Sequence, residues 1–187
     1  LDWGFHKNRY CGEKKPGYRA YCHPDNFDPV ANILYRNNGD GTFTDVSSQS
    51  AVAASPGKGL GVAFADYDGD RFIDVYVAND SVQSFLFRNK GNGTFEDVAA
   101  QAGVAADGWS TGCAFFDADA DGDLDLYVAR YVKTTWENVT AAQRTLTWRN
   151  GPKIMVGPQG LPGEPDVFFE NLGNGRFRDA TVAAGLT

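Results

Sequence analysis

Residues 117–125 read Asp-Ala-Asp-Ala-Asp-Gly-Asp-Leu-Asp, and the rest of the chain is organised around this stretch. Counted from its first residue, aspartates stand at positions 1, 3, 5 and 9, and Gly122 stands at position 6. Glycine tolerates the positive φ angle that a tight loop needs. Alternating carboxylates on such a loop converge on one point, which suits a hard cation with oxygen ligands such as Ca²⁺.

The same spacing occurs a second time. Residues 66–74 read Asp-Tyr-Asp-Gly-Asp-Arg-Phe-Ile-Asp, with aspartates again at positions 1, 3, 5 and 9. The alternative is a pair of solvated acidic loops without metal, in which neighbouring carboxylates would repel one another. Because the ligand requirements of a calcium loop are met twice, the sequence favours two cation sites.

The residues around the loops distinguish them from EF-hands. An EF-hand needs a bidentate Glu at position 12 and a helix on each side, but position 12 is Val77 in one loop and Val128 in the other. The flanks 61–65 and 73–77 are β-branched, aromatic and alternating, which is typical of strands. We therefore expect a calcium loop that joins the two strands of a β-hairpin.

A second hairpin pattern occurs three times, at residues 32–46, 84–98 and 166–180. Each copy has an apolar run, a turn rich in Asn and Gly, and a second β-forming run. The first two copies are 52 residues apart, and the third follows after 82 because of an insertion at 131–165.

Together the two patterns define a unit of four antiparallel strands, typical of a propeller blade. We expect strands at 60–66, 73–78, 84–89 and 94–98, and again at 112–117, 124–129, 166–171 and 176–180. The predicted fold class is all-β, a β-propeller segment of about two and a half blades with the calcium loops in the hairpin of each blade's first two strands. The predicted divisions of this one propeller segment, 1–187, are an insertion tail and last hairpin (1–49), a complete blade (50–101) and a second complete blade with the 131–165 insertion (102–187).

The net charge of −7 belongs to the loops. Nine of the 24 acidic residues are loop aspartates, and the remainder nearly balance the 17 Lys and Arg. Two bound Ca²⁺ ions would offset four of the loop charges. No basic stripe indicates nucleic acid as a partner, and no apolar run has the length of a membrane span.

The cysteines indicate a compartment. Cys11 and Cys22 bracket a loop rich in Gly, Lys and Pro and are predicted to form a disulfide; the alternative is two unpaired thiols. Cys113 lies on an expected strand and is predicted to be a small buried hydrophobe. A disulfide, together with loops suited to millimolar calcium, favours an extracellular or periplasmic location.

The sequence resembles the FG-GAP/VCBS repeat family, the calcium-loop propellers of integrin α-chains and of many secreted bacterial proteins. The resemblance lies in the lead-in segments 61–66 and 112–117 and in the exits 74–79 and 125–130. The hairpin segment 37–43, Asn-Asn-Gly-Asp-Gly-Thr-Phe, is similar to the cartilage-acidic-protein-like branch, where such repeats often precede an ASPIC/UnbV segment.

The resemblance implies two Ca²⁺ ions and a ligand set for each. The first set consists of the side chains of Asp66, Asp68, Asp70 and Asp74 with the backbone carbonyl of Phe72. The second consists of the side chains of Asp117, Asp119, Asp121 and Asp125 with the carbonyl of Asp123.

Two departures from the family pattern affect these expectations. Arg71 occupies position 6, where the family has Gly, and a non-glycine residue at positive φ costs about 1 kcal/mol or more. The first site is therefore expected to be weaker than the second or to have a different shape. Propellers of the family have about seven blades, so the resemblance implies completion by the rest of a longer chain, by copies of this chain or by a partner.

Catalysis is not expected. Residues 108–112, Gly-Trp-Ser-Thr-Gly, match a hydrolase motif that requires a strand before the serine, a helix after it and a later histidine. Here a strand follows, and His6 and His23 come earlier in the chain. We therefore expect a binding or scaffolding module with an adhesion-like role, whose protein or glycan partner is unknown, and structural calcium. The alternative is a propeller that binds carbohydrate or cleaves polysaccharide.

Overall fold

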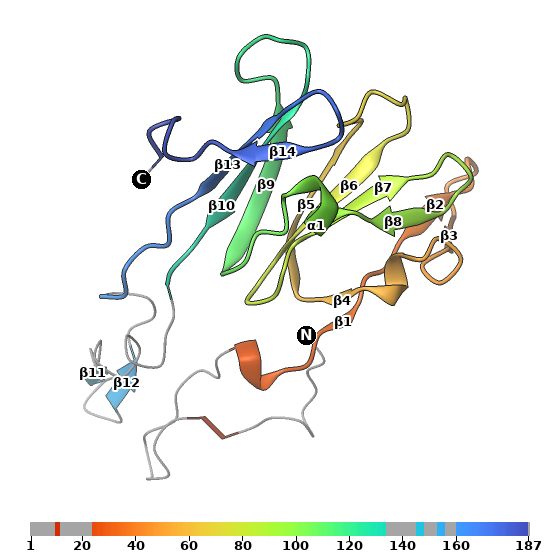
Figure 1. The fold of residues 1–187 in the computed structure, drawn as a ribbon. Helices are drawn as coiled ribbons and strands as arrows, with labels where there is room; N and C mark the ends of the chain where they lie inside the picture. The colour runs from red at the N-terminus through yellow and green to blue at the C-terminus, as the bar shows by residue number, and fades with distance from the viewer. Residues whose placement is uncertain (1–9, 12–23, 134–144, 148–152, 156–159, 187) are drawn as a thin grey trace.

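The computed structural model describes residues 10–11, 24–133, 145–147, 153–155 and 160–186. Within them, two four-stranded antiparallel sheets lie side by side (Figure 1). The first sheet contains β5 (Gly59–Ala65), β6 (Asp74–Asn79), β7 (Phe85–Asn89) and β8 (Phe95–Asp97). The second contains β9 (Ser110–Phe116), β10 (Asp125–Arg130), β13 (Val167–Asn171) and β14 (Phe177–Asp179).

The remaining elements are short. They are η2 (Pro24–Asn26), β1 (Val30–Ala31), β2 (Tyr35–Asn37), β3 (Phe43–Asp45), η3 (Val52–Ala54), β4 (Pro56–Gly57), α1 (Ala99–Ala102), β11 (Thr145–Thr147) and β12 (Lys153–Met155). The pairs β1–β4, β2–β3 and β11–β12 form separate two-stranded sheets. None of the helices in the described part of the chain has the length and apolar character needed to cross a bilayer.

The two large sheets confirm the predicted fold class. Each pairs its strands in chain order, as four antiparallel strands of a propeller blade do, and each predicted strand is present to within two residues. The domain boundaries stay predictions. Cys22 and much of the 131–165 insertion lie outside the described residues, so the Cys11–Cys22 disulfide also stays a prediction.

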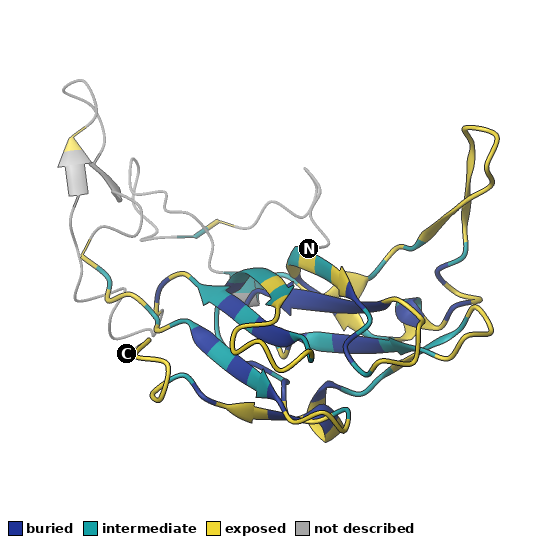
Figure 2. Cartoon of the chain, turned by 90° about the horizontal axis from the view of Figure 1, so that it is seen from above, coloured by how far each residue is buried: buried dark blue, intermediate teal, exposed yellow. Residues whose placement is uncertain are grey.

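The main core lies between the two large sheets, where the buried residues gather (Figure 2). Alternate positions of the first sheet contribute Tyr76, Ala78 and Leu86, and the facing side of the second contributes Leu126, Val128, Val167, Phe169 and Phe177. Cys113, predicted to be a buried hydrophobe, is half-buried and packs against this core as a free thiol. Burial raises its pKa to about 11.

The first strands of the two sheets approach each other closely at two glycines. A Cβ on Gly61 would lie 2.8 Å from the Cα of Gly112 and 3.0 Å from the carbonyl oxygen of Thr111. Carbon atoms in contact are normally about 3.5–4.0 Å apart. The absence of a side chain at Gly61 therefore sets how closely the sheets pack.

The other face of the first sheet is only partly covered. Val75, Val77 and Phe87 are buried under Val52 and Leu34. On β5, however, Leu60, Val62 and Phe64 are 52%, 55% and 60% exposed. These side chains line a cleft of about 350 Å³.

A helical turn follows each hairpin and was not predicted. In the first copy it is a turn at 47–50, in the second it is α1, and in the third it is a turn at 181–185. Each turn ends at, or is directly followed by, a residue at positive φ: Ala51 at 69°, Gly103 at 82° and Gly185 at 75°. The repeat therefore extends beyond its strands.

Candidate metal centres

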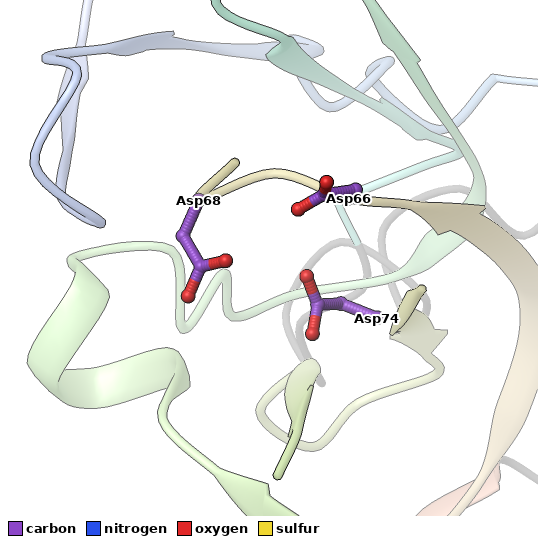
Figure 3. Close-up of side chains that lie close together, drawn as sticks. All are labelled: Asp66, Asp68 and Asp74. Carbon is purple, nitrogen blue, oxygen red and sulfur yellow. The ribbon is translucent and has the colours of Figure 1, made fainter. Parts of the chain in front are cut away.

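The loop between β5 and β6 brings three aspartates together. Asp66 follows the last residue of β5, Asp74 is the first residue of β6, and Asp68 lies between them. Each offers a carboxylate oxygen within 4.8 Å of the others. In Figure 3 the three carboxylates face a common space.

The loop between β9 and β10 repeats this arrangement. Asp117, Asp119 and Asp125 occupy the same loop positions, 1, 3 and 9, and their oxygens also lie within 4.8 Å of one another. Both loops join neighbouring antiparallel strands. The structure therefore brings together six of the predicted site residues in two equivalent clusters.

Backbone N–H groups hold the aspartate at position 1 in place. In the first loop, Asp66 accepts hydrogen bonds from the N–H of Asp70 at 3.0 Å and of Arg71 at 2.8 Å. In the second loop, Asp117 accepts from the N–H of Asp121 and of Gly122, both at 3.2 Å. Each loop is thus wrapped around its first carboxylate.

Both loops have positive φ at positions 4 and 6. The first loop has Gly69 at 73° and Arg71 at 74°, and the second has Ala120 at 63° and Gly122 at 97°. Each loop therefore holds one glycine and one strained residue. The expectation that Arg71 makes the first loop alone strained overlooked Ala120, so backbone strain gives no reason for unequal sites.

The aspartate at position 9 is buried in both loops. Asp74 is 0% exposed and Asp125 is 3% exposed. Asp74 accepts hydrogen bonds from the N–H of Tyr67 at 3.3 Å and of Asn89 at 2.8 Å. Asp125 accepts equivalent bonds from the N–H of Ala118 at 3.0 Å and of Asn171 at 2.8 Å.

The charge state of these carboxylates reflects their surroundings. Burial raises the pKa of Asp74 to about 6, against the lowering effect of the N–H groups of Asn89 and Tyr67. Burial also raises the pKa of Asp68 and that of Asp119. A divalent cation would favour the ionised form of each group, and an all-oxygen donor set fits Ca²⁺.

The remaining predicted ligands lie outside these clusters, and their role stays a prediction. Asp70 and Asp121, at position 5, accept hydrogen bonds from the N–H of Phe72 at 2.8 Å and of Asp123 at 2.9 Å. Phe72 and Asp123, at position 7, extend their side chains towards a glycine of the following hairpin turn. A Cβ on Gly91 would lie 2.5 Å from the Phe72 ring, and a Cβ on Gly173 would lie 2.7 Å from the Asp123 carboxylate.

Sequence reasoning missed three residues that support the loops. Asn89 and Asn171 end the third strand of each sheet and bind the buried aspartates, whereas the hairpin pattern predicted only a strand that ends there and a turn after it. Their recurrence at one position of the hairpin repeat is the signal that would have found them. Tyr67, at position 2, is buried with its ring centroid 5.6 Å from that of Phe177.

The hydrolase-like motif has no exposed serine. Ser110 is the first residue of β9 and is fully buried. The two histidines lie outside the described residues.

Comparison with known proteins points to one family. The FG-GAP-like repeat family matches residues 24–77 and 66–128, which together span more than half of the chain. Human cartilage acidic protein 1 is 35% identical over 100 residues, 53% of this chain. The Xenopus tropicalis protein of that name is 37% identical over 73 residues, 37% of this chain.

The similarity covers only a small part of those relatives. The matched segment is 15% of the human protein and 11% of the Xenopus protein. The mouse protein gives the same values as the human one, 35% identity over 53% of this chain and 15% of its own length.

Proposed function

Because this chain belongs to the FG-GAP-like repeat family, we propose that it binds two Ca²⁺ ions, one in each of the loops 66–74 and 117–125. The observation that carries the proposal is the pair of equivalent clusters in which carboxylate oxygens lie within 4.8 Å of one another. Asp70, Asp121 and the carbonyls of Phe72 and Asp123 would complete the coordination, since Ca²⁺ takes six to eight oxygen ligands.

The proposed role of calcium is structural. Each ion would neutralise aspartates that otherwise repel one another and would fix the turn between two strands. A ligand that binds only the folded form stabilises it by mass action, by about 2.7 kcal/mol per site at a hundredfold excess over Kd. For a chain of this length, each kcal/mol corresponds to roughly 2–4 °C in Tm.

Isothermal titration with Ca²⁺ tests the proposal, together with calorimetric melting in 2 mM Ca²⁺ and in excess EGTA. We expect two ions per chain and a Tm rise of roughly 5 °C or more on calcium addition. Asp68→Asn and Asp119→Asn should each remove one ion. Glu96→Gln removes one negative charge from β8, which contributes no residue to either aspartate cluster, and should leave both ions bound. A chain that binds no Ca²⁺ would overturn the proposal.

We propose that the calcium-loaded chain serves binding or scaffolding, with an adhesion-like role, rather than catalysis. The burial of Ser110 supports this proposal, because a nucleophile must reach its substrate. The proposed location is extracellular or periplasmic, where millimolar calcium would saturate loops of this class. A panel of polysaccharides tests the alternative, and turnover on any of them would contradict the proposed role.

We also propose that further sheets complete the fold. The exposed side chains Leu60, Val62 and Phe64 lie on one face of the first sheet. The equivalent face of the second sheet is covered by the first sheet. The rest of a longer chain, a second copy or a partner could each provide such a cover. Sedimentation equilibrium of the purified chain measures its mass in solution. A mass above that of one chain would indicate a second copy rather than a longer chain or a different partner.

A further inference from the structure

Asn171, at the end of β13, contacts both acidic loops and is 4% exposed. Its side-chain amide donates one hydrogen bond to the carbonyl of Tyr67 at 2.9 Å, in the first loop. The same amide donates another to the carbonyl of Leu124 at 3.0 Å, in the second loop. Its backbone N–H donates to Asp125 at 2.8 Å.

This hydrogen bonding uses all the donors of the residue. An asparagine amide has two N–H donors, and each has one acceptor here. The side-chain oxygen accepts from the N–H of Gly173 at 3.1 Å. The Tyr67 carbonyl lies between Asp66 and Asp68 in the chain, and the Leu124 carbonyl directly precedes Asp125. One side chain therefore fixes the backbone beside metal-cluster residues of both loops.

Asn89 provides an internal comparison. It is the equivalent residue of the first sheet and makes the same local hydrogen bonds, to Asp74 at 2.8 Å, to the carbonyl of Ile73 at 3.1 Å and from Gly91 at 3.0 Å. Among the described residues, the structure gives its amide no bond to a second loop. Asn89 is accordingly half-buried, whereas Asn171 is buried.

We propose that Asn171 is a positioning residue that couples the two calcium sites, so that an ion in one loop raises the affinity of the other. The proposal rests on the proposed function, since it requires both loops to bind Ca²⁺. An ion in the first loop holds Asp66 and Asp68 and therefore the Tyr67 carbonyl between them. That carbonyl orients Asn171, whose N–H and amide orient Asp125 and Leu124.

The physical basis is shared ordering. The first ion fixes part of the loop that the second ion must otherwise order, and the second ion binds more tightly for that reason. The effect is reciprocal, because coupling between two sites is one free energy. The hydrogen bond from the Asn171 amide to the Tyr67 carbonyl joins two neutral groups and transmits this coupling free energy. We therefore expect a coupling factor of about threefold to tenfold.

Calcium titration of single-site variants measures this factor. Asp119→Asn leaves the first site, and Asp68→Asn leaves the second. The coupling factor is the overall two-site association constant of the unaltered chain divided by the product of the two single-site constants. Neither of these two carboxylates accepts a hydrogen bond from the Asn171 amide, so both substitutions leave the hydrogen bonds of that amide in place.

The titrations of the unaltered chain and of the two single-site variants are then repeated with Asn171→Ala added and with Asn89→Ala added. Asn171→Ala should bring the coupling factor to one, whereas Asn89→Ala should weaken the first site and leave the factor unchanged. If Asn171 had only a structural role, Asn171→Ala would lower the free energy of unfolding without changing the coupling factor. Circular dichroism checks that each variant is folded. If Asn171→Ala does not fold, Asn171→Ser, which also lacks both amide donors, takes its place.

The outcomes separate this inference from the proposed function. Two bound ions with a coupling factor of one would overturn the coupling alone, as would a factor that survives in folded Asn171→Ala. No calcium binding by any variant would overturn the proposed function and the coupling with it.

Discussion

Gly61→Ala tests the close contact between the two sheets. The new Cβ would lie 2.8 Å from the Cα of Gly112 and 3.0 Å from the carbonyl oxygen of Thr111, and both are backbone atoms that cannot rotate away. The matched control is Gly112→Ala. Gly112 is the equivalent residue of the second sheet, and its Cβ would meet only the Cβ of Ala129 at 4.0 Å.

The magnitude follows from these distances. Relief of the overlap requires the sheets to separate by roughly 1 Å, a gap that forfeits a quarter to a half of each contact's dispersion energy. Overpacking of this kind destabilises by about 1–3 kcal/mol. Alanine offsets about 0.4–1 kcal/mol by restricting the unfolded chain. We therefore expect Gly61→Ala to lower the free energy of unfolding by about 1–2 kcal/mol, and Gly112→Ala to leave it unchanged or slightly raised.

Urea unfolding and calorimetric melting at saturating Ca²⁺ measure both variants. The expected loss for Gly61→Ala is about 2–8 °C in Tm. Equal stabilities of the two alanine variants would refute the assigned contact, because only one of the two added methyl groups meets backbone.

Four further predictions concern Asp74, the two non-glycine loop residues at positive φ, and Cys113. Burial raises the pKa of Asp74 to about 6, so the folded form holds the proton more tightly than the unfolded form. The free energy of unfolding of the metal-stripped protein should therefore fall as pH rises from 4 to 6. Calcium needs the carboxylate, so calcium affinity should instead fall as pH drops through 6; a calcium affinity that is the same at pH 5 and pH 7.5 would contradict this. Arg71→Gly and Ala120→Gly each relieve a residue at positive φ and should raise calcium affinity by similar factors, up to about tenfold, and a gain confined to Arg71→Gly would show that strain is unequal after all. Burial raises the pKa of the Cys113 thiol to about 11, so iodoacetamide at pH 8 should alkylate it on the order of a hundredfold more slowly in the folded than in the urea-unfolded protein, as followed by mass spectrometry.

The local features of the fold were predictable because neighbouring residues determine them. Alternating β-branched and aromatic residues marked the strands, and regular aspartate spacing marked the loops. The register followed as well, since the residues on either side of each loop pair directly: Ala65 with Asp74, and Phe116 with Asp125. Recurrence of the pattern then predicted two equivalent sheets.

The site was less predictable wherever its geometry depends on a second strand. The spacing gave four aspartates of equal standing in each loop, but positions 1, 3 and 9 cluster and position 5 does not. Position 9 is distinct because it begins a strand, where the N–H of Asn89 or Asn171 reaches it from the neighbouring hairpin. The helical turns after the hairpins were missed because stretches of Ala, Gly and Ser have weak patterns.

By itself, the sequence determined the strands, the acidic loops and the repeat, because each is a matter of spacing within a few residues. Only the tertiary structure decided how the repeats contact one another. The hydrogen bond from Asn171 to Tyr67 joins residues 104 positions apart, and the contact between Gly61 and Gly112 depends on how two sheets stack. Such contacts have no local signature, because the partner of each residue is set by the packing of whole sheets.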